Sequence, residues 1–547
     1  MFDRAAALTT LAGRRFDVLV IGGGITGAGV ALDAASRGLS VALVERDDFA
    51  SGTSSASSKL VHGGLRYVSQ GELGLVAQAL AERHRLLRNA PHLVRPLPFV
   101  LPLGGGAAAA RSVGTALWLY DAAGGARLGQ VHRRLSVDET RARVPALRAD
   151  AFRRAYLYLD AHADDARLTL AVVRTAVIDH GAVAANHSAV VGLLRGRTGR
   201  VVGARVVADG QEIEVRASVV VNAAGVWSDE VGGLEDDALG AGGRAATIRP
   251  AKGVHLTVHR SRLPATSAAV LPVAADGRSI FVIPWPGTDR VYIGTTDTDY
   301  QGDVDQARCS AADVAYLLAA VNPSLSEPLT PADVVGCWAG LRPLVAGATG
   351  GRGGGGGRTA DLSRRHRLSE SDRGVVTITG GKLTTYRRMA ADTVDRVAAI
   401  LGAGARSRTA TLRLRGAPAA GPGDGPVSAS RYGTESGGVQ ALVAADASLG
   451  ELLVDGLPYL RAEVVHAVRH EMARTLGDVL DRRLRARILD RDGAAAAASD
   501  VAALVGPELG WTRAEADANV VAYRADLDAE RAYAGLLGDD RRHRNAG

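Results

Sequence analysis

Three glycines near the start of the chain have the spacing of a dinucleotide-binding turn. They are Gly22, Gly24 and Gly27, and they follow a short apolar run rich in β-branched residues that predicts a buried strand over residues 16–21. Gly22 permits a tight turn, Gly24 lets the backbone approach a pyrophosphate, and Gly27 allows close packing of the next helix. That helix, predicted over residues 25–36, would direct its N–H groups and the positive end of its dipole at the phosphates.

A glutamate completes this unit. Glu45 follows a second apolar strand, residues 41–44, and can accept hydrogen bonds from a ribose hydroxyl. A glycine turn alone is a weak indication, but here strand, turn, helix, strand and acid occur in the required order. Because Glu45 would repel a 2′-phosphate, the sequence predicts FAD or NAD rather than a turn that binds nothing.

Two further segments combine small, hydroxyl-bearing and basic residues. S-G-T-S-S-A-S-S-K runs from Ser51 to Lys59 and continues into L-V-H-G-G-L-R-Y, which ends at Tyr67. Its dense N–H groups and hydroxyls favour contact with a cofactor over a flexible serine-rich loop. V-V-T-I-T-G-G-K-L-T-T-Y, which begins at Val375, predicts strand, glycine turn and helix, and hence a second helix N-terminus facing a ligand. The strand that ends in V-V-V-N-A-A-G (residues 219–225) predicts another backbone approach to the dinucleotide.

The composition fits a globular protein and disfavours some functions. A chain of 547 residues can form two or three domains, and 47% hydrophobic with 22% charged residues is ordinary. The net charge of +7 is mild for this length, and the sequence contains no Lys/Arg run or basic–aromatic pattern of a nucleic-acid-binding protein.

The cysteines and the hydropathy bear on location. Cys309 and Cys337 are the only cysteines, which excludes a disulfide framework and favours a reducing compartment. No segment reaches the ~18 uncharged apolar residues of a membrane span. Arg14 and Arg15 imitate a twin-arginine signal, but Asp17 and the glycine motif favour a strand there. We expect a cytoplasmic protein, with peripheral contact to the inner face of the membrane left open.

The elements that must position these motifs follow from periodicity. Residues 1–13 are expected to form a loose lead, and residues 245–300 an antiparallel sheet of a substrate domain. Asp164 and Asp165 are interpreted as capping a helix through Val177. The glycine-rich segment 346–358 is expected to be a disordered surface loop.

The C-terminal part is expected to be almost wholly helical beyond a linker at residues 416–430. Within it, residues 463–489 place apolar side chains on one stripe and arginines largely elsewhere. We interpret this segment as a packed helix with a solvated basic face, and keep a membrane-binding helix as the alternative.

Taken in order, these motifs resemble one family. G-G-G-I-T-G-A-G with Glu45, the serine block with K-L-V-H-G-G-L-R-Y, D-D-A-R-L, V-N-A-A-G-V-W, I-G-T-T-D, G-L-R-P-L and G-G-K-L-T-T-Y-R are similar to those of the FAD-dependent, aerobic respiratory glycerol-3-phosphate dehydrogenases. The match covers about residues 16–400 and is weaker beyond. The serine block and the G-G-K-L-T-T-Y block are its specific elements.

The resemblance implies a fold of the α/β plus α+β class. A Rossmann-like FAD-binding domain of the D-amino-acid-oxidase/glutathione-reductase type would be accompanied by an antiparallel-sheet substrate domain and a helical C-terminal domain. The expected bounds are 14–95, 160–235 and 335–402 for the FAD domain, 96–159 and 236–334 for the substrate domain, 416–430 for the linker, 431–533 for the helical domain and 534–547 for a basic tail.

The resemblance also implies non-covalent FAD, oxidation of sn-glycerol 3-phosphate to dihydroxyacetone phosphate by hydride transfer to flavin N5, and electron delivery to the membrane quinone pool. The expected cofactor-binding residues are Gly22, Gly24, Gly27, Glu45, Thr53, Ser54, Ser57, Ser58, Lys59, His62, Gly63, Gly64, Leu65, Ala224, Gly225, Gly381, Lys382, Leu383 and Thr384.

A small phosphate dianion with a secondary alcohol needs fixed cations and a base. Arg66 and Arg342 are the predicted phosphate ligands, because guanidinium matches phosphate, with Tyr67 and Lys382 beside them. His255 is the predicted base for the hydroxyl proton, with His62 as the alternative. Lys382 and the helix N-terminus after Gly381 would stabilise negative charge on the reduced flavin.

Several alternatives remain open at this point. A glycerol-3-phosphate oxidase that produces hydrogen peroxide would have nearly the same motifs. An amine or amino-acid oxidase of the same superfamily would leave the set of cations unexplained, and a non-enzymatic flavin-binding protein would not need Arg66, Arg342 and His255 together. Whether the chain forms a homodimer is also left open.

Overall fold

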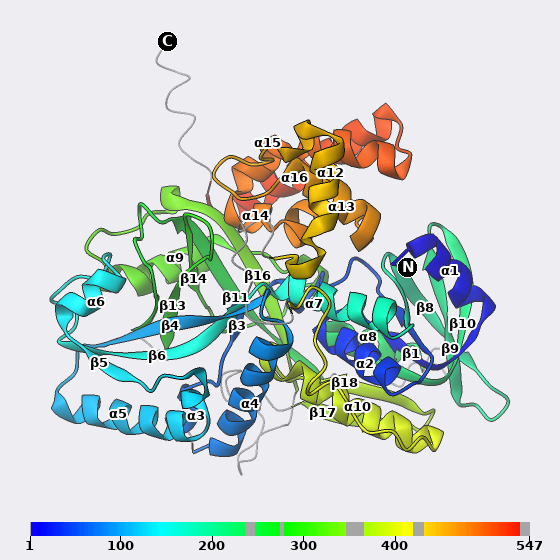
Figure 1. Ribbon diagram of the computed structural model, residues 1–547, viewed down its shortest axis with the longest axis horizontal. Coiled ribbons are helices and arrows are strands. Elements are labelled where there is room, and N and C mark those ends of the chain that lie inside the picture. Colours follow the sequence, from blue (N-terminus) through cyan, green and yellow to red (C-terminus); the bar gives the residue numbers. More distant parts are fainter. Residues whose placement is uncertain are drawn as a thin grey trace.

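The computed structural model of the chain describes residues 2–69, 71–235, 247–273, 278–345, 366–418 and 431–536. These residues form two β-sheets that lie side by side and a helical C-terminal domain that packs over their junction (Figure 1). The predicted glycine-rich loop at 346–358, residues 419–430 of the predicted linker and residues 537–547 of the predicted tail lie outside the described residues.

The first sheet contains the glycine motif. Its strand order is β17-β18-β10-β1-β2-β7, and β8 and β9 continue from β10. The strands are β1 (Arg15–Ile21), β2 (Val41–Val44), β7 (Val183–Ala185), β8 (Ser188–Arg195), β9 (Val201–Ala208), β10 (Gln211–Asn222), β17 (Arg367–Glu370) and β18 (Val375–Thr379). The central strands pair in parallel, which explains why β1 and β2 are almost continuously apolar and buried.

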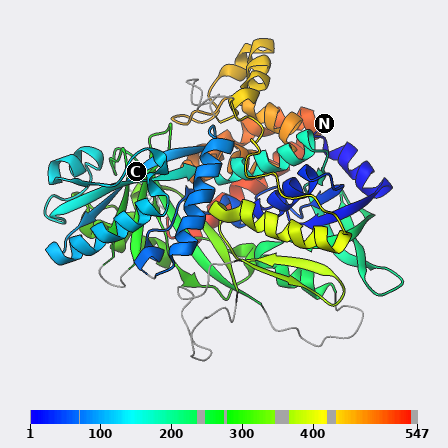
Figure 2. The same cartoon turned by 60° about the horizontal axis from the view of Figure 1, so that its bottom comes forward.

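Helices cover the first sheet. α2 (Ile25–Ser36) follows the glycine turn and packs between α7 (Asp165–Arg174) and α10 (Tyr386–Leu401). Both views show α10, in yellow, lying beside α2 although the two are far apart in sequence (Figures 1 and 2). The strand–turn–helix units predicted around residues 16–45 and 375–401 are therefore neighbours in one domain.

The second sheet is mainly antiparallel. Its order is β15-β11-β14-β13-β12-β4-β6-β3, with β16 paired to β11 and β5 to β6. The strands are β3 (Leu60–Val61), β4 (Val94–Leu103), β5 (Arg133–Leu135), β6 (Arg154–Ala163), β11 (Ile248–His259), β12 (Ala268–Pro272), β13 (Ser279–Pro284), β14 (Arg290–Gly294), β15 (Thr298–Asp299) and β16 (Val334–Val345). Since β16 pairs along the length of β11, residues 335–345 lie in this sheet and not in the FAD domain as predicted.

The remaining helices lie around the two sheets. They are α1 (Arg4–Gly13), α3 (Arg66–Ser69), α4 (Leu73–Asn89), α5 (Ala107–Ala122), α6 (Val137–Arg143), α8 (Ser228–Gly233), α9 (Ala311–Val321), α12 (Ser436–Ala445), α13 (Arg461–Glu471), α14 (Ala486–Leu489), α15 (Arg491–Leu509) and α16 (Arg513–Tyr533). Within the described ranges, none of the helices is long and apolar enough to span a membrane.

The N-terminal lead is not loose as predicted. It forms α1, at whose start the Asp3 side chain accepts a hydrogen bond from the Ala6 N–H. The buried Arg4 side chain donates to the carbonyl oxygen of Asn186 at 2.8 Å and to the carboxylate of Asp209 at 2.5 Å. These long-range contacts hold the lead against the first sheet, and no local sequence pattern reveals them.

The single amphipathic helix predicted over residues 463–489 is also wrong. α13 ends because Met472 adopts a left-handed backbone conformation (φ 57°), and Arg485 does the same (φ 67°). Arg482, Arg485 and Arg487 are largely buried and paired with carboxylates. Of its arginines, only Arg469 and Arg474 remain exposed, with side chains 49% and 38% accessible, so the segment is not one helix with a continuous basic face.

Candidate active site

A cavity of about 470 Å³ is lined by both sheets. The carboxyl ends of β1, β2 and β10 lie on one side of it, and β11, β13 and β16 on the other. The predicted site residues that line it are Gly22, Gly24, Glu45, Thr53, Ser54, Ser57, Ser58, His62, Tyr67, Ala224, Gly225, His255, Arg342, Gly381, Lys382, Leu383 and Thr384. Residues from seven separate stretches of sequence thus meet in one place.

The glycine turn is kept open by its lack of side chains. A Cβ at Gly22 would lie 2.7 Å from the carbonyl oxygen of Ala223, and one at Gly24 would lie 3.1 Å from Ser54 Oγ. Gly27 does not line the cavity, because it packs against the Gly22 carbonyl, which a Cβ there would overlap. The turn and the N-terminus of α2 therefore present backbone to the cavity, as a pyrophosphate requires.

Glu45 binds the turn as well as lining the cavity. Its Oε2 accepts from the Gly23 N–H at 2.6 Å, and its Oε1 accepts from the Asp47 N–H at 2.9 Å. Burial raises the pKa of the Glu45 carboxyl to about 7, against the lowering effect of these two hydrogen bonds. This carboxyl group is placed where the ribose of a dinucleotide would need an acceptor.

The serine loop, defined as residues 51–59, contributes backbone and hydroxyl groups to the cavity. It contains a 3₁₀ turn over Thr53–Ser55, and Thr53 Oγ1 donates to the carbonyl oxygen of Leu341 in β16 at 2.5 Å. Lys59 does not line the cavity. Its Nζ lies 3.1 Å from Asp165 Oδ2, with both side chains fully buried.

Some residues of the segment after the serine loop line the cavity, and others pack in the protein interior. His62 and Tyr67 line the cavity, whereas Gly63, Gly64 and Leu65 do not. The Gly63 N–H instead donates to the hydroxyl of Tyr120 at 3.0 Å. Arg66 begins α3, and its side chain lies outside the described part of the structure.

Two cations and a phenol are among the residues that line the cavity. The Lys382 ammonium is 3.9 Å from the centre of the Tyr67 ring, a cation–π contact. Arg342 is anchored by Asp297, with Nη1 to Oδ1 at 3.1 Å, and its Nη2 donates to the carbonyl oxygen of Thr296 at 3.1 Å. Asp297 and the backbone of Thr296 thus orient the guanidinium.

His255 lies opposite Trp338 in the pairing of β11 with β16. The two rings stack with centroids 4.7 Å apart, and His255 Nε2 is 2.8 Å from Ser58 Oγ. Burial, reinforced by the charges of Lys59 and Arg342, lowers the pKa of His255 well below its ordinary value. The imidazole is therefore neutral near pH 7, with nitrogen lone-pair density available to accept a proton.

Sequence reasoning missed several residues of the site. Arg46 and Trp227 line the cavity, with the guanidinium 5.0 Å from the indole ring, and Trp227 Nε1 donates to Asp305 at 2.8 Å. Asp164 does cap α7, but Asp165 is a buried partner of Lys59 and Arg485. Arg485 is 320 residues from Asp165 in sequence, so no local pattern links them.

Comparison with known proteins agrees with this geometry. Residues 17–387 match the family of FAD-dependent oxidoreductases, and residues 426–516 match the C-terminal domain of α-glycerophosphate oxidase. A glycerol-3-phosphate dehydrogenase of Mycobacterium leprae is 42% identical over 96% of this chain and 91% of its own length. The structure is similar to that of glycerol-3-phosphate dehydrogenase from Bacillus halodurans complexed with FAD, with a TM-score of 0.76, 31% identity and coverage of 97% and 98% of the two chains.

A more distant likeness concerns the fold alone. The structure of L-α-glycerophosphate oxidase from Mycoplasma pneumoniae aligns with a TM-score of 0.55 at 16% identity, and it covers 73% of this chain and 99% of the oxidase chain. The glycine turn, Glu45 and the serine loop fit FAD, the cofactor of the matching family, because together they offer phosphate-facing backbone, a ribose acceptor and a dense set of N–H and hydroxyl groups.

Proposed function

Because the chain belongs to the FAD-dependent glycerol-3-phosphate dehydrogenases, we propose that it oxidises sn-glycerol 3-phosphate to dihydroxyacetone phosphate and passes the electrons to a membrane quinone. The observation that carries the proposed chemistry is the convergence of Arg342, Lys382, Tyr67 and His255 on the cavity that contains the glycine turn. Cations suited to a phosphate and a neutral base thus share one compartment with the FAD-binding elements.

Each residue has a distinct proposed role. Arg342 binds the substrate phosphate, since its guanidinium is oriented by Asp297 and Thr296. Lys382, held over Tyr67, adds a second positive charge to the lining of the same cavity. Arg66 remains a predicted phosphate ligand, because its side chain lies outside the described part.

His255 is the proposed acceptor of the hydroxyl proton. Its Nε2 contacts Ser58, and its ring is fixed by stacking on Trp338, so the imidazole has one defined orientation in the cavity. Bound FAD supplies the acceptor for the hydride that leaves C2 of the substrate. The cavity residues bind the substrate and remove the proton, while the hydride chemistry belongs to the cofactor.

The test is anaerobic mixing of the purified yellow protein with sn-glycerol 3-phosphate, followed by flavin absorbance. Bleaching by this substrate and not by glycerol is the expected result, because the proposed roles of Arg342 and Lys382 are to bind the phosphate group that glycerol lacks. Absence of bleaching with FAD still bound would contradict the proposed function and direct attention to amine substrates.

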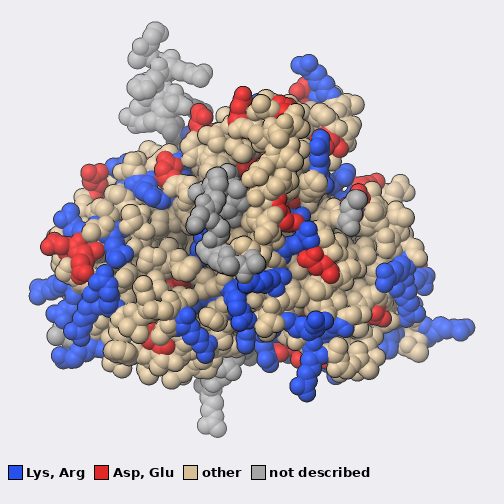
Figure 3. All heavy atoms as spheres, in the orientation of Figure 1, with Lys and Arg blue, Asp and Glu red and all other residues tan. Residues whose placement is uncertain are grey.

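The proposed quinone acceptor requires contact with a membrane surface. Trp118 and Leu119 of α5 and the nearby Val131 are 61%, 44% and 52% exposed. Trp118 packs against His132, the sequence neighbour of Val131, and we call Trp118, Leu119 and Val131 the apolar patch. Exposed arginines accompany the patch, namely Arg111, Arg127, Arg133 and Arg134. Figure 3 shows Lys and Arg gathered at the left-hand end of the molecule, over the region where Figure 1 places α5 and β5.

An apolar patch beside arginines suits the anionic surface of a membrane. We prefer this patch to residues 463–489 as the membrane contact, because Arg482, Arg485 and Arg487 are largely buried and only Arg469 and Arg474 of that segment's arginines stay exposed. The peripheral location proposed from the sequence therefore rests on α5 and its neighbours.

Oxygen as acceptor is the second candidate, favoured by the match of residues 426–516 to a domain named for α-glycerophosphate oxidase. The reduced protein distinguishes the two when it is mixed with a soluble quinone analogue or with oxygen. Faster reoxidation by the quinone analogue supports the dehydrogenase, and faster reoxidation by oxygen with stoichiometric hydrogen peroxide supports the oxidase.

A further inference from the structure

We propose that Arg485, in the helical C-terminal domain, is a positioning residue that fixes the serine loop against the FAD cavity and, through Ser58, orients His255. The inference rests on the proposed function for the role of His255. It assigns to the C-terminal domain a part in building the cofactor site, although Arg485 does not line the cavity.

The first step of the argument is the contact of Arg485 with the loop itself. Its Nη2 donates to the carbonyl oxygen of Ser55 at 2.6 Å and to Asp165 Oδ1 at 3.0 Å. Lys59 Nζ donates to the same Ser55 carbonyl at 3.0 Å and lies 3.1 Å from Asp165 Oδ2. The side chains of Lys59 and Asp165 are fully buried, and that of Arg485 is 2% exposed.

Asp165 extends this cluster along the loop. Its Oδ2 accepts from both the backbone N–H and the Oγ of Ser57, at 3.0 and 2.7 Å. Loop residues 55, 57 and 59 are therefore all bonded to one buried cluster, which we call the Arg485 cluster (Lys59, Asp165 and Arg485). Because every second residue from 55 to 59 is held, the backbone of residues 56 and 58 between them has little conformational freedom.

Ser58 transmits this order to His255. It lies between two residues bonded to the Arg485 cluster, and its Oγ is 2.8 Å from His255 Nε2. The second sheet holds the same residues from the other side, where the Tyr292 hydroxyl donates to the Ser58 carbonyl at 3.0 Å and Trp338 Nε1 to the Ser57 carbonyl at 3.2 Å. Any shift of the loop must move the hydrogen-bond partner of His255.

The buried charges indicate that the Arg485 cluster orients the serine loop and does not serve mainly to hold the domains together. Lys59, Arg485 and Asp165 are buried together, and the partly exposed Asp164 lies 3.6 Å from Arg485 Nε. Burial lowers the pKa of Lys59 to about 8, and the charge of Arg485 adds to this, although Asp165 and Asp164 oppose it. Buried charges carry a large desolvation penalty, and apolar side chains of similar volume often stabilise a protein as well or better. Hydrogen bonds to the serine loop are directional, so they can fix its orientation, which apolar packing does not do.

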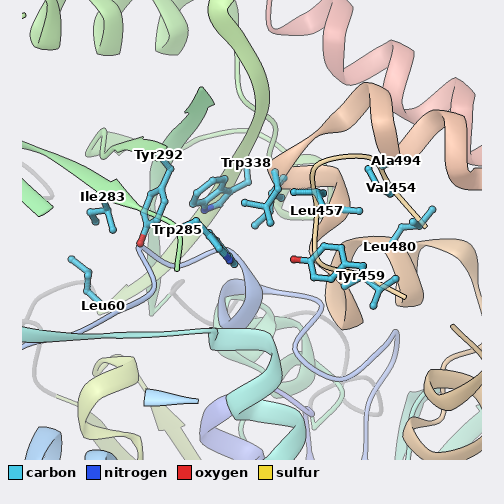
Figure 4. Packing of buried hydrophobic residues seen from close by; sticks show 14 of the residues in the cluster. Leu60, Ile283, Trp285, Tyr292, Trp338, Val454, Leu457, Tyr459, Leu480 and Ala494 are labelled. Atoms are coloured by element: carbon cyan, nitrogen blue, oxygen red, sulfur yellow. The ribbon is translucent and has the colours of Figure 1, made fainter. Parts of the chain in front are cut away.

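Apolar packing between the domains is already present. Figure 4 shows Trp285 and Trp338 between Tyr292 of the second sheet on one side and Leu457 and Tyr459 of the C-terminal domain on the other, and these residues belong to one buried cluster. In addition, Arg485 occupies the left-handed region at φ 67°, a backbone conformation that a non-glycine residue adopts only when its surroundings hold it there. The backbone at Arg485 is thus held in this conformation at a free-energy cost, as is that of Lys59 (φ 56°) in the same cluster.

The experiment compares Arg485→Gln with Arg487→Gln. Arg487 is a matched control, because it is a largely buried arginine of the same segment whose partners Asp481, Asp526 and Glu530 all lie within the C-terminal domain. For each variant we would measure the FAD dissociation constant of the apoprotein, hydrogen exchange of residues 51–59 in the apoprotein, the thermal midpoint, and the rate of flavin reduction by sn-glycerol 3-phosphate.

We expect Arg485→Gln to bind FAD about tenfold more weakly and to exchange faster at residues 51–59. Its flavin reduction should slow by up to about 100-fold, since small misplacements of catalytic groups have effects of that size. Arg487→Gln should lower the thermal midpoint and leave the other three quantities within about twofold of wild type. Equal effects of the two variants on FAD binding and loop exchange would overturn the inference.

If Arg485→Gln does not fold, Arg485→Lys provides a second test of the inference. The lysine retains the buried charge but loses the planar fork of donors, so FAD affinity and reduction rate should lie below wild type. Wild-type values for Arg485→Lys would overturn the inference. FAD binding and exchange need no substrate, so failure of wild-type flavin to be bleached by sn-glycerol 3-phosphate would reject the proposed function while these readouts still decide the role of Arg485.

Discussion

At the scale of single residues, the environment of His255 determines the pH range in which it can act. Its burial and the charges of Lys59 and Arg342 lower its pKa, so the imidazole loses its proton well below pH 6.5 and stays neutral above it. The rate constant for flavin reduction at saturating substrate should therefore not fall as the pH is lowered from 8 to 6.5. His255→Asn should reduce that rate constant by about 10²- to 10⁴-fold, as for loss of a general base.

Stopped-flow absorbance across this pH range checks both parts of the prediction. Saturating substrate removes the influence of phosphate ionisation, which has a pKa near 6 for phosphate esters and affects binding. An inflection near pH 6.5 in the wild type, absent from His255→Asn, would show that His255 titrates normally and that the pKa argument is wrong.

Glu45 gives a second pH-dependent prediction, in the apoprotein. Its pKa is raised to about 7 in the folded state, from an ordinary 4.5, so the folded protein holds this proton more tightly than the unfolded chain. The stabilisation is fully present below pH 4.5 and is lost as the pH rises through 7. At about 1.4 kcal/mol per pKa unit, its upper limit is about 3 kcal/mol.

Glu45→Gln should remove this dependence. The thermal midpoint of the apoprotein should therefore fall less between pH 5 and pH 8 in the variant than in the wild type, and the difference between the two slopes isolates Glu45 from other titrating groups. Parallel midpoint curves would show that Glu45 titrates alike in the folded and unfolded states.

At the scale of elements, the approach of β11 to β16 positions Arg342. A Cβ at Gly253 would overlap Arg342 Nη2 and lie 2.8 Å from Thr295 Oγ1. Gly253→Ala should therefore displace the guanidinium and raise the KM for sn-glycerol 3-phosphate about 10- to 100-fold, the value of a hydrogen bond to a charged group. FAD content should not change, because Gly253 lies in β11 of the second sheet and belongs to neither the glycine turn nor the serine loop.

Steady-state kinetics with Gly74→Ala as control tests this. Gly74 lies in α4, and a Cβ there would meet nothing within 4 Å. An unchanged KM for Gly253→Ala would mean that Arg342 is not a phosphate ligand or that it can move without loss of binding.

The elements also show which parts of the molecule the sequence could predict. The strand–turn–helix units around Gly22 and Gly381 were predictable because their signals are contiguous, and the comparisons confirm the family, the fold class and FAD. The order α1 imposes on the N-terminus was not predictable, since it depends on Arg4 reaching Asn186 and Asp209. The same holds for Arg485, whose partners are hundreds of residues away.

The candidate site also contains residues that the sequence predicted and residues whose placement it predicted wrongly. The cavity brings together the predicted Arg342, Lys382 and His255, but their roles remain predictions until the proposed measurements are made. Lys59 was predicted to bind the cofactor from its place in the serine block, whereas its side chain is turned to the buried Asp165. Motif membership locates a segment at a site, but it does not decide which of two alternating faces a side chain occupies.

At the scale of the whole molecule, the exposed apolar patch on α5 should decide whether the protein reaches a membrane quinone. Burying Trp118 and Leu119 at a lipid surface is favourable, and the neighbouring arginines would be attracted to anionic headgroups. The double variant Trp118→Ser/Leu119→Ser should lose about tenfold in affinity for anionic vesicles, measured by co-sedimentation, and more of its activity with a membrane quinone than with a soluble acceptor. The matched control is Val521→Ser on α16, a residue that is 68% exposed on the C-terminal domain, and it should bind vesicles like the wild type. Loss of binding in the control but not in the double variant would move the membrane contact to the C-terminal helices.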